Sequence, residues 1–191
     1  PHEKIKIQLY DWILGIAACE VEETLAPPVR ETALMEFMLE LMKERIEVKG
    51  NSLITKRMPE EEKNIQIYIA CQRALFRLDP PLISYNLLKK WCPDWSDLPL
   101  EKLEEITKNI YSVWEKIEEN LHHPLAEKFY NVCERYDTPY LILGDIISAD
   151  PAGAKSNLEN PEILENKIKD AYQKRLKKVK GRLARAAFYS T

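Results

Sequence analysis

Hydrophobic residues recur every three or four positions along most of the chain, which is the spacing of one face of an α-helix. The clearest example runs from about Pro99 to Leu121, where the hydrophobic positions form an almost strict repeat: Leu103, Ile106, Ile110, Val113, Ile117 and Leu121. A seam of this kind packs against a neighbouring helix at a shallow angle. The pattern therefore predicts an all-α fold, a single, mostly antiparallel, bundle-like domain of six to eight helices that includes a long basic C-terminal helix.

Proline and glycine set the expected ends of these helices, because proline disfavours the helical conformation in the residue before it and glycine commonly follows a last turn. Helices are predicted at about residues 3–25, 29–48, 59–78, 82–91, 99–121, 125–136 and 161–191. The run from Tyr140 to Ile147 is hydrophobic almost throughout, and by periodicity alone it fits a buried strand as well as a helix. Because no partner strand is evident elsewhere, a buried helix is favoured.

The charge is distributed unevenly between the two ends of the chain. The net charge is −3, yet the residues from Lys167 onward hold nine Lys or Arg against one acid, Asp170, so this end carries +8 and residues 1–166 carry −11. Three segments are expected on this basis. Residues 1–152 form an acidic helical core domain, residues 153–160 a connector, and residues 161–191 a long basic amphipathic helix.

The predicted C-terminal helix has a good start, because Asn160 can cap its first amides and Pro161 suits the first helical position. Gly181 falls inside the pattern and is expected to weaken the helix without ending it. Its hydrophobic residues form one stripe between basic flanks: Ile168, Tyr172, Leu176, Val179, Leu183 and Ala186. The residues expected to bind a membrane or a partner are Lys174, Arg175, Lys177, Lys178, Lys180, Arg182 and Arg185.

A second candidate is the aromatic corner between the fourth and fifth predicted helices. Trp91, Asp94, Trp95 and Asp97 lie within seven residues and make a candidate ligand corner. A packed turn in which Asp97 caps the next helix explains the same residues and is the favoured interpretation.

Catalytic and metal-binding patterns are weak. Glu119 and His122 have the Glu-x-x-His spacing found in helical di-iron proteins, but such a site needs a second copy of the pattern, and none is present. Both His122 and His123 stand at a predicted helix end, where imidazoles commonly interact with terminal carbonyls. Four scattered cysteines and five glycines form no zinc or phosphate-binding motif. We therefore predict no catalytic residues, no cofactor and no metal, and a helical enzyme is the alternative.

Four functions for the basic helix compete. It could be an ordinary solvated helix, dock on an acidic protein face, bind nucleic acid, or lie beside a membrane, where cytoplasmic segments are rich in Lys and Arg. Because the basic run passes into small and aromatic residues, and the chain opens on Pro1, we expect an excised cytosolic part of a membrane protein in which residues 167–189 lead into a transmembrane segment.

The sequence thus predicts a non-catalytic binding or scaffolding module at the cytoplasmic face of a membrane. Its expected partner is an anionic membrane surface or a protein, and it is expected to be a monomer or weak dimer. The alternatives are a helical enzyme with a site near the Trp91–Asp97 corner and a nucleic-acid-binding protein, the latter opposed by the acidic charge of residues 1–166.

Overall fold

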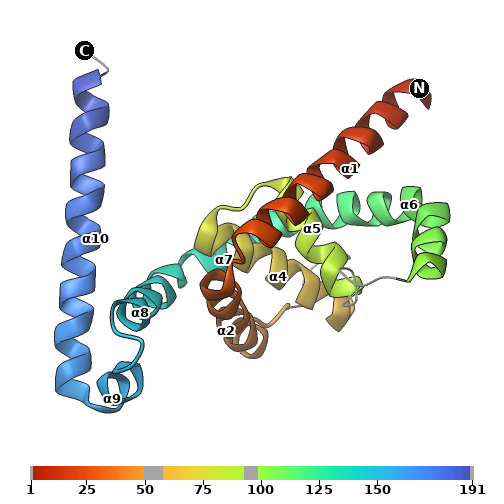
Figure 1. The fold of residues 1–191 in the computed structure, drawn as a ribbon. Coiled ribbons are helices and arrows are strands. Elements are labelled where there is room, and N and C mark those ends of the chain that lie inside the picture. Colours follow the sequence, from red (N-terminus) through yellow and green to blue (C-terminus); the bar gives the residue numbers. More distant parts are fainter. Residues whose placement is uncertain (1, 50–57, 93–98, 190–191) are drawn as a thin grey trace. The chain divides into compact units, whose positions relative to one another are not determined.

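The structure, a computed structural model, describes residues 2–49, 58–92 and 99–189 (Figure 1). Every regular element in these ranges is an α-helix, so the predicted all-α fold is confirmed. Nine helices lie in the described ranges, compared with the six to eight expected, since residues 153–160 are not a plain connector but contain a short helix. The helices are α1 (His2–Leu25), α2 (Val29–Arg45), α4 (Glu60–Phe76), α5 (Pro80–Trp91), α6 (Leu100–Leu121), α7 (Ala126–Glu134), α8 (Asp137–Ala149), α9 (Ala154–Glu159) and α10 (Pro161–Tyr189).

The contacts divide these helices into two compact units, Pro1–Arg135 and Tyr136–Thr191. The sequence had placed the division after residue 152, so α8 belongs with α9 and α10 and not with the helices before it. The reason is that Ile142 and Ile146 of α8 are buried together with Ala171 of α10, with Leu164 packed against them. The hydrophobic run from Tyr140 to Ile147 is helical, as predicted.

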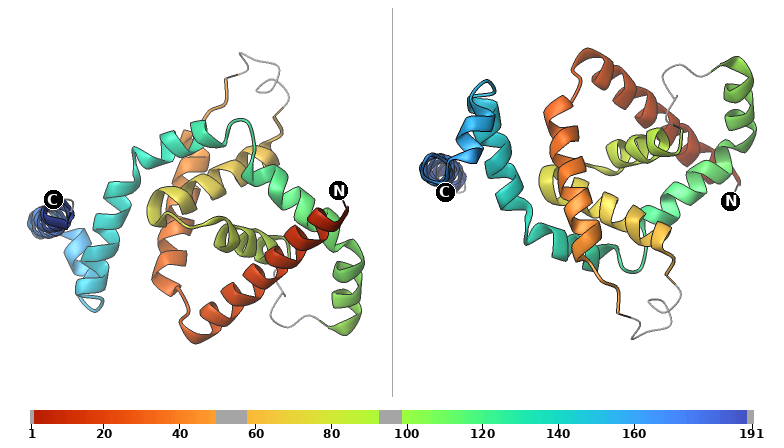
Figure 2. Two further views of the ribbon diagram at one scale, coloured as in Figure 1. Left: turned by 90° about the horizontal axis from the view of Figure 1, so that it is seen from above. Right: turned by 90° about the horizontal axis from the view of Figure 1, so that it is seen from below.

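In the first unit α4 is the central helix, and it packs against α2, α6 and α7 (Figure 2). Every residue from Ile65 to Gln72 is buried, so this helix has no solvent face over more than two turns. Its buried polar side chains are paired in part: Asn86 donates to the Gln72 side-chain oxygen at 2.7 Å, and Gln72 donates to the Tyr68 carbonyl at 3.3 Å. The Sγ atoms of Cys71 and Cys133 lie 4.0 Å apart where α4 meets α7.

Helices α1 and α5 pack against each other, and Gly15 meets Pro81 at their contact. A Cβ on Gly15 would lie 3.4 Å from the Pro81 Cβ, which is ordinary contact distance. At the start of α5, the Asp79 side chain accepts the amide of Leu82 at 3.2 Å, a typical N-terminal cap. Helix α4 ends just before it with Arg77 in the left-handed region at φ 54°.

The second unit is built around α10, which begins as predicted. The Asn160 side-chain oxygen accepts the amides of Glu162 and Ile163 at 3.1 and 3.2 Å. The helix continues through Gly181, whose added Cβ would meet nothing within 4 Å. In the described part of the chain, every helix is either too short or too polar to span a lipid bilayer.

Candidate functional site

The face of α10 that packs is not the stripe seen in the sequence. The side chains that lie against α8 and α9 belong to Leu164, Lys167, Ala171 and Arg175, about a quarter turn away from that stripe. Val179 and Leu183 of the stripe are 52% and 65% exposed, and Tyr172 is 52% exposed. Most of the hydrophobic stripe is therefore exposed in the described structure, because Leu164 and Ala171, together with the ion pairs of Lys167 and Arg175, hold the first half of α10.

One of the seven predicted binding residues has a structural role. The Arg175 Nε atom donates to the Asp145 carboxylate at 2.5 Å, and its guanidinium also donates to the Leu141 carbonyl at 3.2 Å. Arg175 is half-buried and ties α10 to α8. The other six are exposed along α10, and Arg185 donates to the carbonyl of Gly181, one turn earlier. They are Lys174, Lys177, Lys178, Lys180, Arg182 and Arg185.

The base of α10 is fixed by Asp150, which follows α8. Its carboxylate accepts the Gly153 amide and the Asn157 side chain, both at 2.9 Å, and lies 3.4 Å from the Lys167 ammonium. These partners, the Asn157 hydrogen bond first, hold the pKa of Asp150 below its usual value of 3.8. Asp150 thus joins the end of α8, helix α9 and the first half of α10.

The predicted ligand corner can be followed only in part. Trp91 is half-buried at the end of α5, and the Lys116 ammonium lies 4.8 Å from the centre of its ring. A cation at this distance is a favourable partner for an indole face. Asp94, Trp95 and Asp97 lie outside the described residues, so the corner and the proposed cap by Asp97 stay predictions.

A pocket of about 520 Å³ lies among α1, α2, α4 and α5. This volume is in the range of small-molecule sites. Hydrophobic side chains such as Met35, Leu39 and Phe76 line it, and two tyrosines, Tyr68 and Tyr85, contribute to its walls. The sequence did not reveal this pocket, because its lining comes from four helices up to about 70 residues apart and no single helix carries its pattern.

The charged side chains of this pocket are arranged on its tyrosine rings. The Lys90 ammonium lies 4.9 Å from the centre of the Tyr68 ring and that of Lys89 lies 5.1 Å from the Tyr85 ring. Lys89 also pairs with Glu23 of α1. Burial, and after it the charges of Glu36 and Glu23, raise the pKa of Tyr68 to about 12.

The same two causes, burial and nearby carboxylates, raise the pKa of Tyr85 and the pKa of the Cys19 thiol. All three groups therefore stay protonated at neutral pH. The pocket offers hydrogen-bond donors and hydrophobic walls, and its thiol is not an activated nucleophile.

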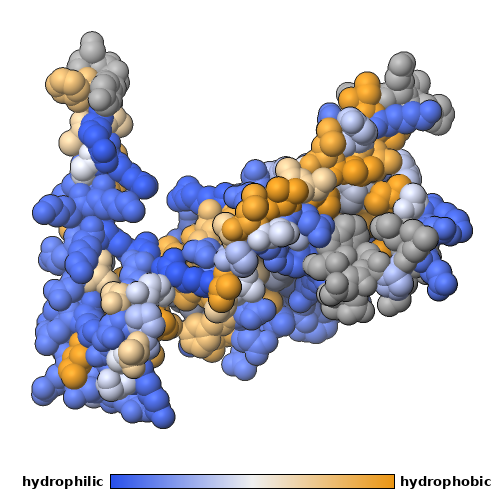
Figure 3. Space-filling model, viewed as in Figure 1, coloured by the Kyte–Doolittle hydropathy of each residue, from blue (hydrophilic) through white to orange (hydrophobic). Residues whose placement is uncertain are grey.

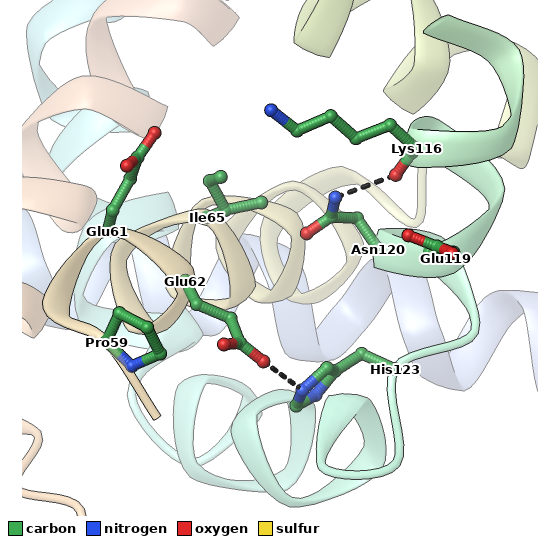
Figure 4. A pocket seen from close by; sticks show the side chains of 8 residues that line it. All are labelled: Pro59, Glu61, Glu62, Ile65, Lys116, Glu119, Asn120 and His123. Carbon is green, nitrogen blue, oxygen red and sulfur yellow. Dashed lines mark hydrogen bonds and ion pairs between the residues drawn. The ribbon is translucent and has the colours of Figure 1, made fainter. Parts of the chain in front are cut away.

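A second pocket, of about 400 Å³, lies where the start of α4 meets the end of α6 (Figure 4). The His123 Nε2 atom lies 2.8 Å from the Glu62 carboxylate across this pocket, and its Nδ1 accepts the Leu125 amide at 3.1 Å. Because Nδ1 is an acceptor here, the Nε2 atom carries the proton that is donated to Glu62. Glu119 and Lys116 line the pocket from α6.

This arrangement separates the two adjacent histidines. His122 is exposed and its Nδ1 lies 3.0 Å from the Glu118 carbonyl, so its predicted interaction with a terminal carbonyl is confirmed. His123 instead contacts a helix that begins about 60 residues earlier, a pairing without a signal in the local sequence. In the described part of the chain no group of three or more His, Cys, Asp or Glu side chains is placed to hold a metal ion.

Comparisons with known proteins add no relative: no protein-family model matches the chain, and neither the curated proteins nor the solved structures that were searched include a match.

Proposed function

We propose that this chain is a non-catalytic helical binding module at the cytoplasmic face of a membrane, and that the second half of α10 binds the anionic lipid surface. The observation that carries the proposal is the exposure of this half. From Lys177 to Phe188 every residue is exposed, and cations and hydrophobic side chains are presented together. An amphipathic helix of this composition binds at the level of the lipid headgroups.

The charges available for this contact are those not used within the unit. Lys167 and Arg175 pair with Asp150 and Asp145, and Lys169 pairs with Glu165 at 2.6 Å. Lys177, Lys178 and Lys180 form no ion pair among the described residues. Each Lys near an anionic leaflet contributes about 1 kcal/mol, so these three residues account for a large part of the expected affinity.

Val179 and Leu183 supply the hydrophobic half of the contact. They lie on one side of α10, one turn apart, and both are more than half exposed. Burial of one Leu or Val side chain contributes about 1.5 to 3 kcal/mol when it is complete. In this arrangement, electrostatic attraction draws the helix to the surface and shallow insertion of the stripe orients it.

Liposome co-sedimentation tests the proposal. The full chain is mixed with vesicles of phosphatidylcholine alone or with added phosphatidylserine, and a variant with Lys177, Lys178 and Lys180 changed to Ala is compared with it. Loss of three cations is expected to lower binding to the anionic vesicles by about 100-fold. The matched control changes three exposed lysines of the first unit, Lys49, Lys108 and Lys128, to Ala and is expected to bind as the unchanged chain does.

Equal binding by both triple variants would contradict the proposal, and so would equal binding to vesicles with and without phosphatidylserine. Duplex DNA added as a competitor distinguishes lipid binding from the alternative, nucleic-acid binding. Displacement of the chain from vesicles by DNA at comparable phosphate concentration would favour nucleic acid as the ligand of this helix.

A further inference from the structure

Helix α1 carries hydrophobic residues on two opposite faces, and only one of them is used inside the unit. The face toward the rest of the unit holds Leu9, Trp12, Ile16 and Cys19, of which Ile16 and Cys19 are 5% and 6% exposed. This face explains why α1 packs on α5.

The opposite face is a second hydrophobic seam. It consists of Ile7, Tyr10, Leu14, Ala17 and Val21, which follow one another at steps of 3, 4, 3 and 4 residues. All five are exposed, with Ile7 at 58%, Leu14 at 50% and Val21 at 58%. Figure 3 shows hydrophobic residues along much of α1. We call these five residues the α1 seam.

The steps of the α1 seam are those of a coiled coil, in which hydrophobic residues occupy the first and fourth positions of a seven-residue repeat. Ile7, Leu14 and Val21 take the first position of successive repeats, and Tyr10 and Ala17 take the fourth. Trp12 and Cys19 then fall at the sixth position, directly opposite the seam. A partner helix on the seam would therefore lie on the side of α1 away from the core of its own unit.

We propose that the α1 seam pairs with the same seam of a second copy of this chain, as a parallel, in-register, two-stranded coiled coil. Charge complementarity identifies the occupant. In such a pair the seventh position of one helix lies beside the fifth position of the next repeat in the other helix. Here these positions are Lys6 and Asp11, both exposed, so each copy offers its partner one cation and one carboxylate.

The remaining flanking positions agree with a parallel pair. Ile13 faces Ala18 of the other copy, which extends the hydrophobic contact, and no like charges meet. An antiparallel pair in the register that joins Lys6 to Glu20 would instead bring the two Asp11 carboxylates together.

Sedimentation velocity of the full chain over a range of concentrations tests the pairing. The unchanged chain is expected to shift from monomer to dimer as concentration rises, and Leu14→Glu is expected to stay monomeric, because it places a charge at the centre of the seam. Gln8→Glu is the matched control: it adds the same charge at an exposed position of α1 outside the seam and is expected to dimerise normally. Circular dichroism of each variant verifies that it is folded.

A charge exchange tests the orientation. Lys6→Glu alone is expected to weaken dimerisation about tenfold, since two attractive pairs become repulsive, and adding Asp11→Lys is expected to restore it. Lys128→Glu, which changes the net charge equally in α7, is expected to have no effect. A chain that is monomeric at every concentration, or whose dimer survives Leu14→Glu, would overturn the proposal. Failure of Asp11→Lys to rescue Lys6→Glu would overturn the parallel arrangement.

Discussion

In the unit of residues 1–135 the middle of one helix, α4, is hidden from solvent on every side, whereas in the unit of residues 136–191 the longest helix is almost entirely exposed. Helix α4 has buried hydrophobic residues on all sides, among them Ile67 and Cys71 at 0% exposure. Helix α10 has a single buried residue, Ala171, in its described length. The same chain thus contains one helix stabilised by its surroundings and one that depends on local contacts.

The difference shows what each unit uses to hold its helices. The first has a broad hydrophobic core, and burial of hydrophobic surface is the dominant stabilising contribution to such a unit. The second has a small hydrophobic cluster supplemented by Asp145 and Asp150, which hold Arg175 and Lys167. A unit of this kind leaves most of its longest helix available for an external ligand, while the first unit offers pockets and the α1 seam.

The largest expected effect on stability is seen when a Leu-to-Ala substitution in the first unit is compared with one in the second. Leu87→Ala removes a side chain with 0% exposure from α5 and is expected to lower the free energy of unfolding of the first unit by about 3 kcal/mol, from lost burial and the remaining cavity. Leu183→Ala removes a 65% exposed side chain from α10 and is expected to change stability by less than about 0.5 kcal/mol. Urea unfolding combined with hydrogen exchange of each helix measures both. A similar loss of unfolding free energy in the two variants would contradict the difference between the buried and the exposed helix.

High pH is expected to destabilise the first unit. The pKa of Tyr68 is raised from 10.0 to about 12, so its contribution to stability is complete below pH 10 and is lost as the pH rises toward 12. The shift corresponds to a loss of about 2 to 3 kcal/mol. Tyr68→Phe should unfold at a higher pH than the unchanged chain. Tyr172→Phe, on an exposed part of α10, is the matched control. An equal rise in the pH of unfolding in both variants would contradict the role of burial.

Two glycines of the second unit are expected to respond oppositely to alanine. An added Cβ at Gly153 would lie 2.4 Å from an Asp150 carboxylate oxygen, so the carboxylate must move away from its partners. Gly153→Ala should therefore speed hydrogen exchange in α9 and at the start of α10. Gly181→Ala meets no neighbour and should stabilise α10 by up to about 1 kcal/mol. Slower exchange at α9 in Gly153→Ala would show that Asp150 is not the organising residue.

Acid gives the smallest expected effect, and it acts on the second unit. Because the folded pKa of Asp150 lies below 3.8, its contribution is complete above that pH and disappears as the pH falls through the lowered value. In Asp150→Asn, hydrogen exchange of the α9 amides should be faster at pH 7 than in the unchanged chain. Lowering the pH below 4 should then accelerate this exchange less than it does in the unchanged chain. Asp170→Asn, exposed on α10, provides the comparison variant and should keep the acid response of the unchanged chain.

The positions of the helices could be predicted from the sequence because their ends carry strong local signals. Asn160 and Pro161 start α10 as expected, and α5 begins at Pro80, two residues before its predicted start. The division into units could not be predicted, since it depends on which hydrophobic faces meet. Ile142 and Ile146 have the same hydrophobic character whether they pack on α7 or on α10, and only the folded chain shows that Ala171 covers them.

The candidate sites were predictable to the extent that they lie on one helix. The cations of α10 form a continuous pattern, and the structure leaves six of the seven exposed. The role of Arg175 was hidden, because Asp145 is 30 residues earlier, as the one charged residue of a hydrophobic segment. His123 and Glu62, and the pocket beside Tyr68, combine residues from distant helices. Periodicity describes one helix at a time and carries no information on such pairs.

The burial of α4 also has a consequence for the order in which the chain becomes structured during synthesis. Residues Glu60–Phe76 leave the ribosome after α1 and α2 but about 50 residues before α7, whose Cys133 lies against Cys71. Until that point one side of the most hydrophobic part of α4 lacks its cover. The growing chain therefore passes through a stage in which this side is open to chaperones or to other nascent chains, and it closes when α7 emerges.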